Sequence, residues 1–203
     1  MSFGAYDHLT ALVVVDLQND FAHPDGSLFV TGGDQLLDGI NAEITAARSA
    51  GSTVVVTQDW HPQVTPHFET HGGVWPVHCI AGSWGAELVD GLDPGHAVSV
   101  VIRKGTNGED GYSGFAMREP GGGVDLPTGL AGLLRERDIA KVAVCGLATD
   151  VCVSATALSS QAACFATTVL WELSRPVCTD DATTERILSE FADAAIKVIG
   201  APA

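Results

Sequence analysis

The chain has 203 residues, of which 46% are hydrophobic, and its 25 acidic residues against 10 Lys and Arg give a formal net charge of -15. A chain of this length can bury one substantial core, and no break in composition divides it, so we expect a single domain over residues 1–203. The charge opposes binding to nucleic acids or anionic membranes, and no run approaches the roughly 18 apolar residues of a membrane span, so we expect a cytoplasmic protein without such partners.

Short apolar runs rich in Val recur along the chain and are typical of strands buried on both faces. In chain order they span residues 11–15, 53–57, 98–102, 141–145, 166–171 and 195–199. Apolar residues at helical spacing predict helices at 36–47, 129–137, 151–163 and 181–194. The alternation predicts a three-layer α/β/α sandwich around a six-stranded, mostly parallel sheet, with irregular stretches at 60–88 and 106–127.

A polar or reactive side chain follows each of the first four predicted strands. In chain order these are Asp16, Asp59, Lys104 and Cys152. Ligands of open parallel sheets bind beyond the carboxyl ends of the strands, so we expect the four side chains to converge there. Each alone has an ordinary explanation, since Asp often caps a turn or helix and Lys is often a surface charge. Four together favour a functional site.

Cys152 is the candidate nucleophile. Residues 141–163 are typical of a strand, a tight turn and a helix, which Thr149 or Asp150 would cap. Cys152 then lies in the first helical turn, where free N–H groups favour a thiolate, and a nearby Lys104 would lower its pKa further. A lone Cys in a helix is otherwise a small buried hydrophobe. We expect that ordinary role for the other cysteines of this region, Cys145 and Cys164.

The segment 57–79 is the candidate metal site. Asp59 and His61 are two residues apart, so in extended backbone their side chains point the same way, and His67, His71 and His78 follow. One carboxylate with two or three imidazoles suits zinc, iron(II) or manganese. Exposed or capping histidines explain irregular His spacing about as well. The position of Asp59 at a strand end favours a metal.

Aromatic residues near these positions could form a slot for a planar ring. Phe21 follows the first strand, Trp75 lies in the His-rich segment, and Tyr112 and Phe115 follow Lys104. Paired aromatic faces hold a flat heteroaromatic ring by stacking. Ordinary loop packing is the alternative explanation for these residues.

Six short motifs occur in order between residues 11 and 200. They are VVVDLQNDF (13–21), QDWH (58–61), WPVHC (75–79), RKG (103–105), YSGF (112–115) and GLATDVCVSATA (146–157). With these motifs the sequence resembles the nicotinamidases (pyrazinamidases) of the isochorismatase-like cysteine hydrolase superfamily. The resemblance implies that the chain hydrolyses nicotinamide to nicotinate and ammonia through a cysteine thioester, as a step of NAD salvage, and also accepts pyrazinamide.

The same resemblance implies a role for individual residues. It implies a catalytic triad of Asp16, Lys104 and Cys152, and an oxyanion hole from the backbone N–H groups of Ala148 and Cys152. It implies one divalent metal ion on Asp59, His61 and His78, with His67 as a fourth ligand in some members, but not on His71. Phe21, Trp75, Tyr112 and Ala148 would contact the ring. A cis peptide bond would join Leu147 to Ala148.

Two departures from the family pattern and several alternatives remain. Val151 stands where many members carry His, and the segment 174–179 is unlike theirs. The chain could instead be an isochorismatase or an N-carbamoyl amidohydrolase of the same superfamily, or a non-catalytic binding protein with this fold. A redox role is disfavoured, because none of the five cysteines forms a CxxC pair. The sequence is compatible with a monomer or a homo-oligomer.

Overall fold

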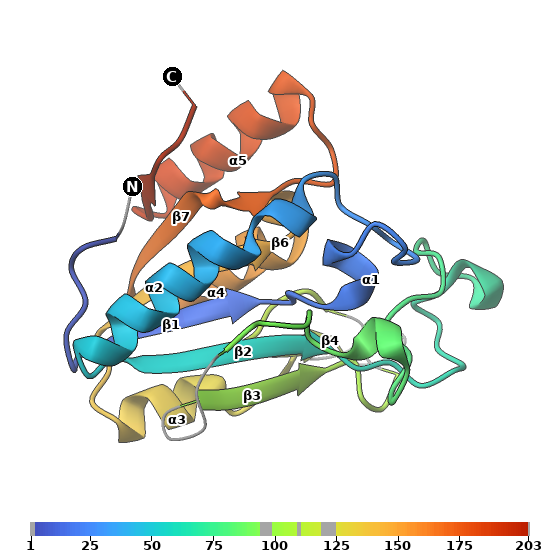
Figure 1. Cartoon of the computed structure of the whole chain (residues 1–203), viewed down its shortest axis with the longest axis horizontal. Helices are drawn as coiled ribbons and strands as arrows, with labels where there is room; N and C mark the ends of the chain where they lie inside the picture. Colours follow the sequence, from blue (N-terminus) through green and yellow to red (C-terminus); the bar gives the residue numbers. More distant parts are fainter. Residues whose placement is uncertain (1–2, 94–98, 109–110, 119–124, 203) are drawn as a thin grey trace.

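A computed structural model describes residues 3–93, 99–108, 111–118 and 125–202. Its main sheet has six strands in the order β3-β2-β1-β6-β7-β8, and every neighbouring pair is parallel (Figure 1). The strands are β1 (Thr10–Val15), β2 (Thr53–Asp59), β3 (Ser99–Lys104), β6 (Lys141–Leu147), β7 (Ala166–Arg175) and β8 (Lys197–Ile199). The predicted sheet is confirmed; Val98, the first residue predicted for the third strand, lies outside the described residues.

The order of the strands reverses in the middle of the sheet. The chain enters at β1, moves outward through β2 to β3, returns to β6 beside β1, and then moves outward the other way to β8. Parallel sheets of this kind open a crevice beyond the carboxyl ends of the two strands at the reversal. In Figure 1, β1, β2 and β3 all point toward the right-hand side, where the one-turn helix α1 (Asn19–Ala22) lies.

Helices cover both faces of the sheet, which confirms the predicted three layers. Strand residues alternate between the faces, with Leu12 and Val14 of β1 on one side and Val13 and Val15 on the other. Helix α2 (Leu37–Ser49) packs on the first side. The second side is covered by α3 (Leu130–Glu136), α4 (Ser154–Ala162) and α5 (Asp181–Asp193). None of the helices in the described ranges is long and apolar enough to cross a membrane.

Short elements without a readable pattern were not predicted. They are the 3-10 turns η1 (Gly33–Gln35), η2 (Glu69–His71) and η3 (Trp84–Ala86), and the antiparallel pair β4 (Ala116–Arg118) and β5 (Asp125–Pro127). Elements of three residues show no periodicity. Cys145 is buried in β6 as expected, but the core position expected of Cys164 is wrong. Cys164 is exposed, because it lies in the turn between α4 and β7 with φ +69.

Candidate active site

The ends of β1, β3 and β6 bring three of the predicted side chains into contact. Asp16 directly follows β1 with φ +47, a left-handed conformation that Asp tolerates better than most residues. Lys104 is the last residue of β3, and its Nζ lies 2.7 Å from Asp16 Oδ2 and 3.5 Å from Cys152 Sγ. The expected convergence is therefore present, at the point where the strand order reverses.

Lys104 is a fully buried cation with two acidic partners. Its Nζ donates a hydrogen bond to Asp59 Oδ1 in addition to the ion pair with Asp16, and its side chain is 0% exposed. Burial alone would lower the pKa of Lys104, but the charges of Asp16 and Asp59 outweigh burial and hold this pKa well above its usual value. The ammonium group therefore stays charged at neutral pH.

The two carboxyl groups beside Lys104 are held in different states. Burial raises the pKa of Asp16 above its usual value, although the charge of Lys104 acts against the shift. For Asp59, burial also acts upward, but Lys104 and the contacts of His61 and His78 outweigh it and hold the pKa well below the usual value. Asp16 is thus the stronger base of the pair, and Asp59 is the more firmly ionised.

The local structure around Cys152 differs from the expected helix start. Cys152 lies in a π-helical turn, η4 (Thr149–Val153), that precedes α4, and neither Thr149 nor Asp150 caps it with a side chain. The expected lowering of the thiol pKa is also wrong. Burial raises the pKa of Cys152 well above its usual value, the carboxylates of Asp16 and Asp59 add to that rise, and Lys104 offsets only part of it. The thiol is therefore protonated and needs a base beside it.

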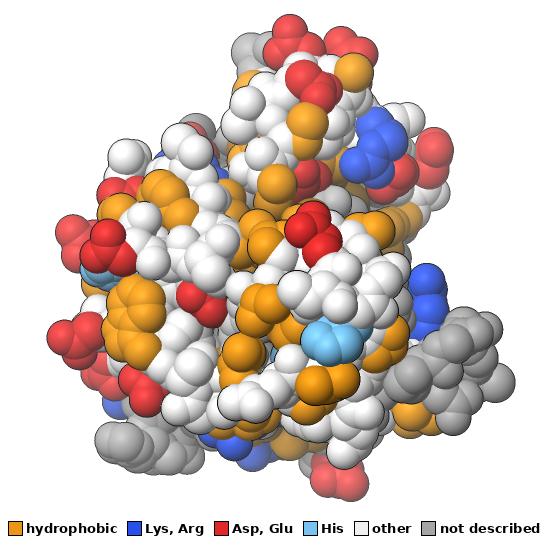
Figure 2. Space-filling model, turned by 90° about the vertical axis from the view of Figure 1, so that its right-hand side faces the viewer, with side chains coloured by type: hydrophobic (Ala, Val, Ile, Leu, Met, Phe, Trp, Pro, Cys, Tyr) orange, Lys and Arg blue, Asp and Glu red, His pale blue; other side chains and the backbone are white. Residues whose placement is uncertain are grey.

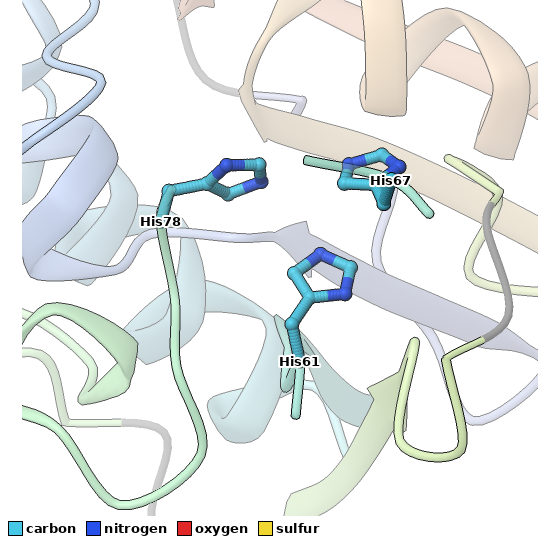
Figure 3. A group of neighbouring side chains, drawn as sticks. All are labelled: His61, His67 and His78. Atoms are coloured by element: carbon cyan, nitrogen blue, oxygen red, sulfur yellow. The ribbon is translucent and has the colours of Figure 1, made fainter. Parts of the chain in front are cut away.

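The three histidines His61, His67 and His78 form one buried cluster. Their rings point toward one another, and one ring nitrogen of each lies within 4.8 Å of those of the other two (Figure 3). Asp59 Oδ2 lies 3.7 Å from Nε2 of both His61 and His78, too far for a hydrogen bond. His71, which the family pattern excludes, is exposed and outside the cluster.

The nitrogens of this cluster are available as metal ligands. His78 Nδ1 lies 2.7 Å from the Pro76 carbonyl, which can only accept, so Nδ1 donates this hydrogen bond and Nε2 is the nitrogen left to act as a ligand. Both ring nitrogens of His61 are buried without a hydrogen-bond partner among the described residues. Burial, with the neighbouring imidazoles, lowers the pKa of His67 to about 4, so this ring is neutral at pH 7. A buried group of imidazoles beside a carboxylate suits a divalent ion.

Gln18 holds the backbone of Asp59, the candidate metal ligand, and sequence reasoning did not single Gln18 out. Its Nε2 donates to the Asp59 carbonyl at 2.8 Å, and its Oε1 accepts from the Asp59 N–H at 2.8 Å. The same Nε2 donates to the Ala86 carbonyl at 2.9 Å. Gln18 belongs to the first quoted motif, so the signal was present, but nothing local in the chain indicates a partner 41 residues away.

A pocket opens onto this centre at the carboxyl edge of the sheet. In Figure 2, which looks onto that edge, hydrophobic side chains border a hollow near the middle of the face. The polar side chains that line the pocket are Asp59, His67, His78 and Cys152. The aromatic ones are the predicted Phe21, Trp75 and Tyr112. The apolar remainder comprises Leu28, Val30, Leu147, Ala148, Val151 and Val177, and the peptide bond between Leu147 and Ala148 is cis.

Three of the four aromatic candidates border the pocket and one does not. Trp75 Nε1 donates to the Tyr112 hydroxyl at 3.0 Å, which ties these two rings together at the rim. Phe21 packs against the ring of His78, with centroids 5.4 Å apart. Phe115 is instead buried in the core against Phe165, so its predicted place in the slot is wrong. Its side chain belongs to the core cluster on the second face of the sheet.

The two departures from the family pattern form part of one pocket wall. Asp150 accepts hydrogen bonds from the backbone N–H groups of Val177 at 2.8 Å and Cys178 at 2.9 Å. These bonds hold the unfamiliar segment after β7 against the pocket, where Val177 joins Val151 in the lining. The carboxylate expected to cap a helix therefore positions a loop.

We predict that Asp150→Ala will release this segment. Loss of two charge-assisted hydrogen bonds should speed amide hydrogen exchange in a peptide spanning residues 175–180 by about 10-fold or more. Hydrogen exchange with mass spectrometry measures this, and a peptide from α5 in the same digest serves as the internal control. Equal exchange of residues 175–180 in the variant and the unmodified chain would show that Asp150 does not hold the segment.

Comparison with known proteins agrees with this geometry. A family model for the isochorismatase domain matches residues 10–170. The chain belongs to the isochorismatase family. Within this family it is 36% identical, over 94% of its length and 98% of the relative's, to the nicotinamidase/pyrazinamidase of Mycobacterium tuberculosis.

Two solved structures of the isochorismatase fold are closely similar to this one. PnC1 from L. infantum, solved in complex with nicotinate, superposes with a TM-score of 0.87 at 39% identity, covering 98% of this chain and 96% of that chain. The pyrazinamidase of Pyrococcus horikoshii, solved in complex with zinc, superposes with a TM-score of 0.81 at 35% identity, covering 94% of this chain and 98% of that chain.

Proposed function

We propose that the chain hydrolyses nicotinamide to nicotinate and ammonia, with Cys152 as the nucleophile. The observation that carries the proposal is the contact of one buried ammonium group, Lys104 Nζ, with Asp16 at 2.7 Å and Cys152 at 3.5 Å beside an aromatic pocket. Similarity to proteins named nicotinamidase and to a structure holding nicotinate supports the choice of substrate. Pyrazinamide, also a flat heteroaromatic amide, is a second substrate.

Asp16 acts as the general base and then as the general acid. It takes the proton of the Cys152 thiol as Sγ forms a bond to the carboxamide carbon, and it passes that proton to the departing ammonia. Water, deprotonated by the same carboxylate, then cleaves the thioester to nicotinate and restores the thiol. A base whose pKa is raised by burial, next to a thiol that is protonated at neutral pH, supports this assignment.

Ala148 and Cys152 stabilise the charge that develops on the carboxamide oxygen. Both residues line the pocket: Ala148 directly precedes the π-helical turn and Cys152 lies within it, at a helix start where the first backbone N–H groups have no partner inside the helix. Donors at such a position stabilise a tetrahedral oxyanion, and the loss of one typically raises the barrier by about 3 kcal/mol. Lys104 places a positive charge beside Cys152. This charge offsets the repulsion between the developing thiolate and the carboxylate of Asp59.

The remaining pocket residues bind and orient the ring. Asp59, His61, His67 and His78 would hold one divalent ion, such as zinc, iron(II) or manganese. When bound, the metal supplies a Lewis-acid centre that can ligate a ring nitrogen of the substrate and so orient it. Phe21, Trp75 and Tyr112 enclose the faces of the ring and exclude water from the thiol.

The alternatives lack a specific observation in their favour. An isochorismatase or an N-carbamoyl amidohydrolase would require a pocket for a non-aromatic or chain-like substrate, whereas three aromatic side chains line this one. A non-catalytic binding protein has no need of a fully buried lysine with two carboxylates, because burying three charges costs several kcal/mol per ion before pairing offsets it. Retention of this cluster supports a catalytic site.

The proposal predicts metal-dependent release of ammonia from nicotinamide. The purified protein is assayed with nicotinamide, pyrazinamide, isochorismate and an N-carbamoyl amino acid, each before and after removal of metal with a chelator. We expect turnover of the two aromatic amides, its loss after chelation and its return when metal is restored. Turnover of only isochorismate or the carbamoyl compound would assign the chain to the corresponding alternative, and turnover of none would favour the binding protein.

A further inference from the structure

The hydroxyl of Thr57 makes two hydrogen bonds to a single residue, Asp16. Thr57 Oγ1 accepts from the Asp16 backbone N–H at 3.2 Å and donates to Asp16 Oδ1 at 2.5 Å. A threonine hydroxyl has one proton to donate, so that proton is committed to Oδ1. The two bonds together tie both the backbone and the side chain of Asp16 to β2, across a sequence separation of 41 residues.

The two oxygens of the Asp16 carboxylate therefore differ. Oδ1 accepts a hydrogen bond from the Thr57 hydroxyl, whereas Oδ2 does not. Oδ2 has the ion pair with Lys104, and a carboxylate oxygen of Asp16 lies within 4.8 Å of Cys152 Sγ. Each oxygen of the carboxylate therefore has its own neighbour, Thr57 for Oδ1 and Lys104 for Oδ2.

The orientation of Thr57 itself is fixed by packing. Thr57 is fully buried in β2, opposite Ile102 of β3. A Cβ added at Gly114 would lie 3.0 Å from Thr57 Cγ2, so the methyl group fills the space beside this glycine of the YSGF motif. A β-branched side chain whose methyl is confined in this way has one χ1 rotamer available, and that rotamer directs the hydroxyl toward Asp16.

We propose that Thr57 is the positioning residue for the catalytic base: its hydroxyl holds Asp16 Oδ1 and so fixes the orientation of the carboxylate that exchanges a proton with Cys152. This inference rests on the proposed function. Lys104 competes for the same carboxylate, because an ammonium group has three donors and could draw both oxygens toward itself. The hydrogen bond from Thr57 prevents the carboxylate from rotating toward Lys104 and keeps it oriented for proton transfer with the thiol.

Loss of the hydroxyl should lower kcat and spare KM. A misplacement of about 1 Å in a proton-transfer group can cost on the order of 100-fold in rate, so we expect a 10- to 100-fold fall in kcat. Thr57 does not line the pocket, and its replacement should leave KM for nicotinamide within about 3-fold. Metal content should not change.

Four variants separate the hydroxyl from the methyl group. Thr57→Val keeps the shape and removes the hydroxyl, and Thr57→Ser keeps the hydroxyl and removes the methyl. Thr57→Ala compared with Thr57→Ser repeats the test without the methyl, in case the valine variant does not fold. Thr53→Val, at the other end of β2, is the matched control and should keep the unmodified kcat. Each is purified with its metal and assayed for ammonia release from nicotinamide.

The expected result is a kcat near that of the unmodified chain for Ser and a 10- to 100-fold lower kcat for Val and for Ala, with KM preserved. Equal kcat for Val and Thr, or an equal fall for Ser and Ala, would overturn the assignment, since the hydroxyl would then have no role of its own. Absence of activity in the unmodified chain would instead refute the proposed function, so the two failures are distinguishable.

Discussion

Replacement of Cys152 by alanine is expected to abolish ammonia release from nicotinamide, lowering kcat by at least about 10,000-fold. Cys152 lines the pocket and is the proposed nucleophile, and the Nζ of Lys104 lies 3.5 Å from its Sγ. Without it, only water activated by Asp16 could attack the carboxamide, and the thioester route is closed. Steady-state assays of ammonia release measure the loss, and the remaining binding site should still take up metal.

The control for this variant is Cys164→Ala, which removes an exposed sulfur from a surface turn. It should keep the unmodified rate. Cys152→Ala should still fold, because deletion of one small side chain near a pocket typically costs no more than about 3 kcal/mol of stability. Circular dichroism and metal analysis check that neither unfolding nor metal loss explains the inactivity. A folded, metal-containing Cys152→Ala protein that still turned over at a tenth of the native rate would exclude the nucleophilic role.

The sheet and its active edge could be predicted because both depend on local patterns. Residues 11–15, and residues 142–145 of the run 141–145, are apolar at every position, which is typical of strands covered on both faces. Parallel strands bring their carboxyl ends to one edge, so Asp16 and Cys152, 136 residues apart, could be placed together by counting where each run stops. The sheet observed here has that arrangement, with β1 and β6 as direct neighbours.

The supporting contacts could not be predicted, because each joins segments that are far apart in the chain. Thr57 in a buried strand and Gln18 in a loop are unremarkable as residue types, and only the fold shows that they hold Asp16 and Asp59. Asp150 satisfied the pattern of a helix cap but bonds to a loop 27 residues away. When a side chain can accept a hydrogen bond from either a local or a distant N–H group, the sequence does not show which of the two it will bond.

The direction of the Cys152 pKa shift could not be predicted either, because it depends on residues that are distant in the chain. A helix start and a nearby lysine both favour a thiolate, and both are readable from the chain. Full burial and two carboxylates oppose them, and these depend on how Asp16 and Asp59 pack around Lys104. With one cation against two acids, the cluster cannot readily accept a third negative charge. The thiolate is therefore expected to form only as Asp16 takes up the proton.

Removal of His61 or His78 is expected to eliminate tight metal binding. Each imidazole has a nitrogen 3.7 Å from Asp59 Oδ2, so both would belong to the one proposed ligand set around that carboxylate. Loss of an outer partner of a metal ligand typically costs 10- to 100-fold in affinity, and loss of a ligand itself should cost more. We therefore expect His61→Ala and His78→Ala to be purified with little metal, as measured by elemental analysis, and to show at least about 100-fold weaker binding in zinc titrations.

The same segment provides the matched control. His71→Ala removes an exposed imidazole of η2 that lies outside the cluster, and it should bind metal as the unmodified chain does. His67→Ala distinguishes a four-ligand site from a three-ligand one, because a partial loss of affinity would identify His67 as a ligand, and no loss would confine the site to Asp59, His61 and His78. Full metal content in both His61→Ala and His78→Ala would mean that the ion binds elsewhere. The buried, unpartnered nitrogens of His61 would then need another explanation, since a polar group left unpaired in the interior costs about 1 to 3 kcal/mol.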